Sequence, residues 1–137
     1  MKNLLSATVL FVLFAVSACS LQDHNIPTLP ISIKTLPIEF DSGTWFNVQV
    51  DNLGDKAVKE YGAVYTSYYK GVGNHNYQPT IANARVKFST PIALGKNQQK
   101  FNGDFIFGQT FFYYRAYAIL EDDSVVYGDM ISFTVPH

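Results

Sequence analysis

The stretch FFYYRAYAIL, residues 111–120, places four aromatic residues directly before a single arginine. In an extended strand, alternate side chains point to opposite faces of the sheet. Arg115 therefore shares a face with Tyr113 and Tyr117, while Phe112 and the two alanines share the other face. Because a lone arginine is almost never buried without a partner, we expect the Arg115 face to point to solvent. The face of Phe112 then becomes a stripe of the hydrophobic core.

Segments of similar character lie on both sides of this stretch. They are rich in ring-bearing and β-branched residues, as strands are, and none keeps a 3.6-residue period long enough for a helix. Turn signals such as DSG at 41–43 and EDDS at 121–124 separate them. We expect strands at 31–36, 45–50, 61–67, 84–88, 100–107, 110–120 and 125–135. Seven short strands in about 110 residues predict an all-β, immunoglobulin-like β-sandwich spanning residues 31–137.

The other strands supply apolar stripes that can pack against the Phe112 face. Each stripe consists of residues two positions apart, which point to the same face of a strand. The stripes that we expect to face the core are Phe46, Val48 and Val50; Phe101, Phe105 and Phe107; and Ile131, Phe133 and Val135.

Two longer segments carry a resemblance to a known family. VDNLGDKAVKEYGAVYTS at 50–67 and FNGDFIFGQTFFYYRAYAILEDDSVVYGDMISFTV at 101–135 resemble a fibronectin type III-like domain, in the variant common in lipoproteins of Bacteroidota. The resemblance covers about half of the folded region and implies a seven-strand sandwich in two sheets without catalytic residues. If the strands pair as they do in the family, Arg115 lies over Tyr61 or Tyr65 of a neighbouring strand.

The first eighteen residues have the character of an export signal. A lysine near the start is followed by an apolar run and then by small residues before Cys19. The stretch VSAC at 16–19 resembles the lipobox of bacterial lipoproteins, which implies cleavage before Cys19 and lipidation of its thiol. Acyl chains on that residue would hold the protein to a membrane, since each buried CH₂ contributes about 0.8 kcal/mol. We therefore expect a signal peptide at 1–18 and a lipidated tether at 19–30.

The residue after Cys19 bears on the cellular location of the protein, and the net charge bears on the class of partner. Ser20 stands where many lipoproteins of the inner membrane carry aspartate, which favours the outer membrane of the cell envelope. Without residues 1–18 the chain keeps nine basic and eleven acidic residues, a net charge of −2. This balance offers no basic patch and argues against a nucleic-acid partner.

The residues typical of catalytic or metal sites do not form a recognisable pattern. The three histidines lack the spacing of metal ligands, and no cysteine is left in the folded domain. The carboxylates of EDDS lack the spaced oxygens of a calcium loop, and no serine lies in a G-x-S-x-G turn. We expect no cofactor, no metal and no enzymatic activity, with a small hydrolase as the minority alternative.

Two groups of residues remain as candidate binding sites. The segment YTSYYKGVGNHNYQP at 65–79 gathers tyrosines that could stack on a ligand or simply cap the sandwich. The second group is the Arg115 face, as a partner-binding patch or as a structural feature. We expect a non-catalytic module that binds a protein or a glycan, or alternatively a structural accessory subunit of an envelope complex. The candidate residues are Tyr68, Tyr69, His75 and Tyr77 in the segment, and Tyr113, Arg115 and Tyr117 on the face.

Overall fold

The computed structural model describes residues 28–68, 78–103 and 111–134. All regular structure in these ranges is β-strand, and the described residues contain no helix. The strands are β1 (Ser32–Glu39), β2 (Trp45–Asn52), β3 (Val58–Tyr68), β4 (Ala84–Lys87), β5 (Gly95–Lys100), β6 (Phe111–Leu120), β7 (Val125–Tyr127) and β8 (Ile131–Phe133).

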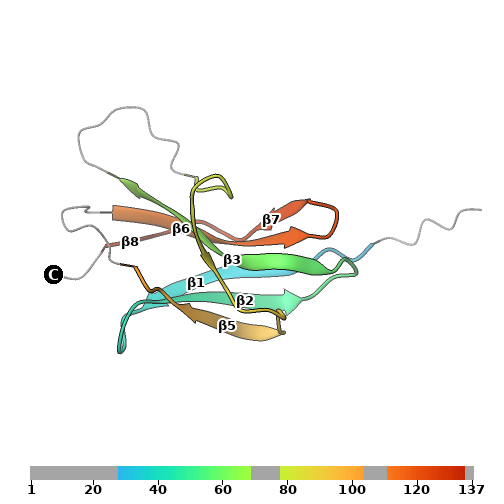
Figure 1. Ribbon diagram of the computed structural model, residues 1–137, viewed down its shortest axis with the longest axis horizontal. Helices are drawn as coiled ribbons and strands as arrows, with labels where there is room; N and C mark the ends of the chain where they lie inside the picture. Colours follow the sequence, from blue (N-terminus) through green and yellow to red (C-terminus); the bar gives the residue numbers. More distant parts are fainter. Residues whose placement is uncertain (1–27, 69–77, 104–110, 135–137) are drawn as a thin grey trace, which may run out of the picture.

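The strands form two antiparallel sheets that lie in two layers (Figure 1). One sheet has the order β1-β2-β5, and the other has the order β4-β3-β6-β7, with β8 also paired to β6. The predicted all-β class and the sandwich-like arrangement are confirmed. The longest pairing joins β3 to β6 from Val58↔Leu120 to Tyr68↔Phe111.

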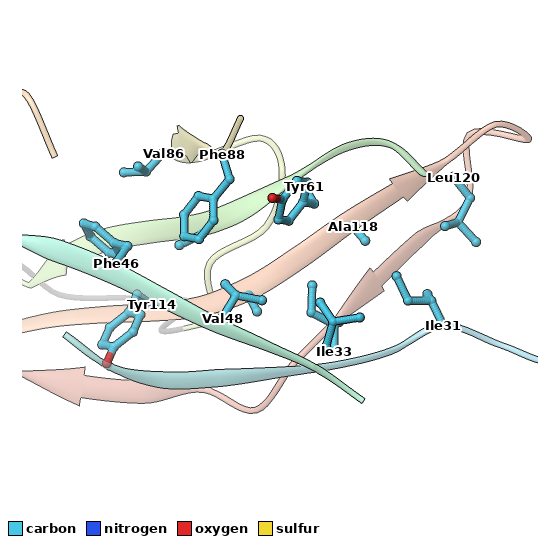
Figure 2. Packing of buried hydrophobic residues seen from close by; sticks show 13 residues of the cluster. Ile31, Ile33, Phe46, Val48, Tyr61, Val86, Phe88, Tyr114, Ala118 and Leu120 are labelled. Atoms are coloured by element: carbon cyan, nitrogen blue, oxygen red, sulfur yellow. The ribbon is translucent and has the colours of Figure 1, made fainter. Parts of the chain in front are cut away.

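The hydrophobic core lies between the two sheets, as the alternation in the sequence predicts (Figure 2). Phe112, Tyr114 and the two alanines of β6 are buried, and so are the predicted core residues of β2. The ring of Phe46 meets that of Tyr114 edge-on, with centroids 5.6 Å apart and planes at 88°. Edge-to-face contacts of this kind add about 0.5–1.5 kcal/mol to the burial of the rings.

Two side chains of the core join β1 to the opposite sheet. The Tyr114 hydroxyl donates to the Leu36 carbonyl at 3.0 Å and accepts from the Ile38 amide at 3.1 Å. It therefore satisfies the backbone of β1 where the pairing with β2 is irregular. The Thr35 hydroxyl accepts the buried Ala116 amide at 2.8 Å. Burial raises the pKa of Tyr114 to about 12, so this phenol keeps its proton at neutral pH.

Two predicted strands are corrected by the structure. The strand expected at 100–107 ends at Lys100 and begins at Gly95, and residues 101–103 are not part of a strand. The strand expected at 125–135 is two short strands, because its regular pairing with β6 is interrupted at residues 128–130, where the Gly128 amide still donates to the Ala116 carbonyl at 3.0 Å. Phe101 does pack against the core, as do Ile131 and Phe133, whereas residues 104–107 and Val135 lie outside the described residues.

Different segments and strand connections lie at the two ends of the sandwich. The chain enters β1 beside the β2–β3 connection, where the Asp55 amide donates to the Leu29 carbonyl at 3.0 Å. From that end β3 runs to Tyr68, which pairs with Phe111 at the opposite end. We call these the entry end and the far end. The connection from β1 to β2 also lies at the far end, since Glu39 pairs with Trp45.

Candidate functional site

The Arg115 face of β6 points away from the core, as predicted, but it is not an open surface. Residues 78–83, here called the covering segment, lie against it on the side away from the three-stranded sheet (Figure 1). The Arg115 Nε donates to the Pro79 carbonyl at 2.6 Å. The Ile81 amide donates to the Tyr127 hydroxyl at 3.0 Å. Pro79 is fully buried, so the covering segment and this face form a second packed layer.

Tyr117 is the clearest correction to the predicted surface patch. Its side chain is fully buried although it points away from the core. Val64, which pairs with Arg115 and shares this face, is also fully buried. Tyr113 and Arg115 are half-buried. Alternation along β6 gives only the direction of each side chain, whereas contacts with other strands and with the covering segment decide how far each one is exposed.

The ring beside Arg115 is also different from the expected one. The guanidinium carbon lies 3.8 Å from the centroid of Tyr127, the last residue of β7. Tyr61 and Tyr65 point instead toward the core. The Tyr61 hydroxyl donates to the Ser89 carbonyl at 2.9 Å, and Tyr65 packs against Phe46. The expected contacts were wrong because Arg115 is opposite Val64. Tyr65 and Tyr61 are one and three positions from Val64, and side chains an odd number of positions apart lie on opposite faces.

A cluster of charged residues surrounds the Tyr117 hydroxyl, and none of these charged residues stands out in the sequence. The hydroxyl donates to the Glu60 carboxylate at 2.8 Å, which also pairs with Arg85 at 3.0 Å and with Lys87 at 2.7 Å. Burial opposes ionisation of Glu60, but hydrogen bonds from Lys87 and Tyr117 and the two cationic charges lower its pKa overall. Burial raises the pKa of Tyr117 well above its ordinary value, and the Glu60 carboxylate adds to this rise.

These contacts favour a structural role for Arg115. We expect Arg115→Ala to lower the free energy of unfolding by about 1–3 kcal/mol. The change leaves the Pro79 carbonyl without its donor and removes the cation from the Tyr127 ring. Denaturant titration of the two proteins measures the difference. Arg115→Lys is the control. It should lose less stability than Arg115→Ala but still lose some, because lysine keeps the positive charge and lacks the planar set of guanidinium donors. Unchanged stability of the alanine variant would contradict a structural role.

The aromatic segment lies only partly within the described residues. The backbone of Tyr68 ends β3 and pairs with Phe111 at the far end. Tyr69, His75 and Tyr77 lie outside the described residues, and so does Cys19. The structure therefore describes only where the segment begins and where it ends.

The EDDS turn is confirmed as the connection from β6 to β7. Its Asp122 carboxylate pairs with Lys56 at 2.5 Å, and Asp123 pairs with Lys59. The hydrogen bond from Lys56, with two from Ser124, holds the pKa of Asp122 below its ordinary value. The described residues hold no group of three or more histidine, cysteine or acidic side chains placed to share a metal ion.

Comparison with known proteins adds no relative. No family model matches the chain, and no curated protein or solved structure matches it either. Among residues 28–68, 78–103 and 111–134, none belongs to a helix long and apolar enough to cross a membrane.

Proposed function

We propose that this chain is an exported lipoprotein of the cell envelope that displays a non-catalytic binding module. In this proposal residues 1–18 are a signal peptide, Cys19 carries the lipid, and residues 19–30 tether the domain. The outer membrane is the proposed address because Ser20 follows the lipidated residue. The module binds a protein or a glycan.

The strand order supports the fibronectin type III-like part of the proposal. A three-stranded sheet of the first, second and fifth strands faces a five-stranded sheet of the third, fourth, sixth, seventh and eighth strands. Immunoglobulin-like sandwiches with seven strands divide their strands between two sheets in a comparable way. The proposed domain therefore relies on the quoted sequence motifs together with this topology.

The observation that carries the proposed function is the position of the two ends. Residues 28–31 reach β1 at the entry end, whereas β3 delivers Tyr68 to the far end. Phe40 and Phe111 lie at the far end and are each about two-fifths exposed. A lipid on Cys19 would hold the entry end near the membrane, so the aromatic residues of the far end would face outward. Large aromatic side chains are typical of binding surfaces.

The lipid anchor is tested by Cys19→Ala. We expect this change to move the protein completely from the membrane fraction to the soluble or unprocessed fraction, because the alanine offers no thiol for acylation. Metabolic labelling with a fatty-acid analogue, followed by fractionation, measures both effects. Ser20→Ala is the control and should remain labelled. Equal labelling of the Cys19 variant would contradict the lipoprotein proposal.

The binding role is tested by capture. The full chain is immobilised and exposed to a glycan array and, separately, to solubilised envelope proteins. A reproducible glycan or protein partner, lost when Tyr68, Tyr69 and Tyr77 are replaced by alanine, supports the proposal. Turnover of a captured glycan would instead favour the hydrolase alternative.

A further inference from the structure

The outer surface of the three-stranded sheet carries mainly polar and charged side chains around one aromatic residue, Trp45, whose ring centroid lies 6.0 Å from the Lys100 Nζ. Side chains two apart on β2 share this surface, because Phe46, Val48 and Val50 face the core. The outward residues of β2 are Trp45, Asn47 and Gln49. Their direct partners on β5 are Lys100, Gln98 and Lys96. Trp45 is fixed because its indole nitrogen donates to the Asp41 carbonyl at 3.0 Å.

Asn47 lies at the centre of this layer and is buried with an incomplete set of hydrogen bonds. Its side-chain nitrogen donates to the Pro37 carbonyl at 2.9 Å. Its Oδ1 is buried and accepts no hydrogen bond from any described residue. The reverse orientation of the amide would place two acceptors together at Pro37, so the oxygen is held in place. An unsatisfied buried acceptor lowers stability, and a bound hydrogen-bond donor would remove that penalty.

An ion pair covers Asn47. Glu39 is opposite Trp45 in β1, and Lys96 is opposite Gln49 in β5. Their side chains meet at 2.5 Å, so the pair crosses β2 at the position of Asn47. Both side chains are about half exposed, and exposed ion pairs of this kind contribute little to stability. The Glu39–Lys96 pair can therefore separate at small cost and uncover the Asn47 oxygen.

We propose that this surface binds an uncharged sugar ring. A sugar supplies the hydroxyl donor that Asn47 Oδ1 lacks, and its C–H face can pack against the Trp45 ring, whose amphipathic character suits such a contact. Gln98, exposed beside Asn47, offers an amide for a second hydroxyl. The inference rests on the proposed role as a displayed binding module. It names a glycan as the ligand and the outer surface of β1, β2 and β5 as its site.

Trp45 is the only tryptophan in the sequence, so intrinsic fluorescence reports directly on this surface. The full chain, in a detergent without a sugar headgroup, is titrated with cellohexaose, xylohexaose and mannohexaose. We expect at least one of them to give a saturable change in emission and a matching heat in calorimetry. Asn47→Leu should weaken that binding at least tenfold.

The covering ion pair provides the second test. Replacing both Glu39 and Lys96 by alanine should tighten binding about two- to tenfold, because the Asn47 oxygen is then uncovered in the free protein. Lys34→Ala is the matched control: it removes another ion pair of the same surface, with Asp51, and should change the affinity less than twofold. If circular dichroism shows that Asn47→Leu does not fold, the double variant and Trp45→Ala, followed by calorimetry, decide instead.

The outcomes separate this inference from the proposed function. It is overturned if none of the three oligosaccharides changes the fluorescence or gives heat, or if the folded Asn47 variant binds as the parent does. Capture of a partner that is lost in the Tyr68, Tyr69 and Tyr77 variant, with Trp45 emission unchanged, would retain the proposed function and overturn this site. A chain that captures neither glycan nor protein overturns both.

Discussion

Alanine in place of Phe112 is expected to lower the free energy of unfolding by about 3–5 kcal/mol, the usual range for such core truncations. The Phe112 side chain is 2% exposed. Its ring stacks on that of Phe133, with centroids 5.0 Å apart and planes at 17°. Phe133 in turn meets Tyr114 edge-on at 5.5 Å. The variant therefore leaves a cavity among rings that hold β6 to β8. Urea denaturation followed by circular dichroism measures the loss.

Tyr113→Ala is the matched control for this prediction. Tyr113 is the next residue of the same strand, points to the other face and is half-buried. Its removal should cost clearly less than that of Phe112, because less apolar area returns to water. If the tyrosine variant proved the less stable of the two, the assignment of faces in β6 would be inverted.

The faces of β6 could be predicted because one residue decides them. Burying an unpaired guanidinium is costly, so Arg115 could not point into the core. Strict alternation then assigns every other residue of the strand. The same reasoning correctly gave the core face of β2, where Phe46, Val48 and Val50 alternate with polar residues.

β5 could not be predicted from apolar alternation because it has none. Its sequence is GKNQQK, and its inward residues are polar. Asn97, for example, accepts a hydrogen bond from the Ala93 amide at 3.2 Å, and its Oδ1 lies 3.2 Å from the Tyr61 hydroxyl oxygen. The predicted strand was therefore placed too far along the chain, because the prediction followed the apolar pattern that begins at Phe101. Phe101 still packs on the core, but from beyond the end of the strand.

The exposure of the Arg115 face to solvent depends on contacts between distant parts of the chain. The Arg115 Nε meets a carbonyl 36 positions away, and the Ile81 amide meets a hydroxyl 46 positions away. A period of two along β6 carries no information about such contacts. Alternation along β6 therefore predicted correctly which way Tyr117 points, but it could not predict that Tyr117 is buried.

The two candidate sites also differ in whether the sequence alone could suggest them. Tyr68 and its neighbours could be proposed from composition alone, because tyrosines beside glycine and asparagine stand out in a sequence. Asn47 could not, since an asparagine in WFNVQV reads as an ordinary outward residue of a strand. Only the structure shows its buried oxygen and the ion pair that crosses above it.

Gly62→Ala is expected to be the other severely destabilising change, with a loss of at least about 3 kcal/mol, at the upper end for point mutations. Gly62 lies in β3 between Lys87 of β4 and Tyr117 of β6. A Cβ built there would stand 2.0 Å from the Val86 carbonyl oxygen and 3.2 Å from the Lys87 Cα. Both are backbone atoms, which cannot turn aside as the end of a side chain can.

The only relief for an alanine at this position is to move β4 away from β3. That movement breaks a short pairing and pulls Lys87 from Glu60, and it also disturbs the packing of Val86 in the core. Gly95→Ala is the matched control, because a Cβ at Gly95 meets no atom within 4 Å. Its positive φ of 90° alone should cost about 1–3 kcal/mol. Thermal and urea denaturation of both variants compare the two costs. If Gly62→Ala lost no more stability than Gly95→Ala, β4 could not lie as close to β3 as the structure has it.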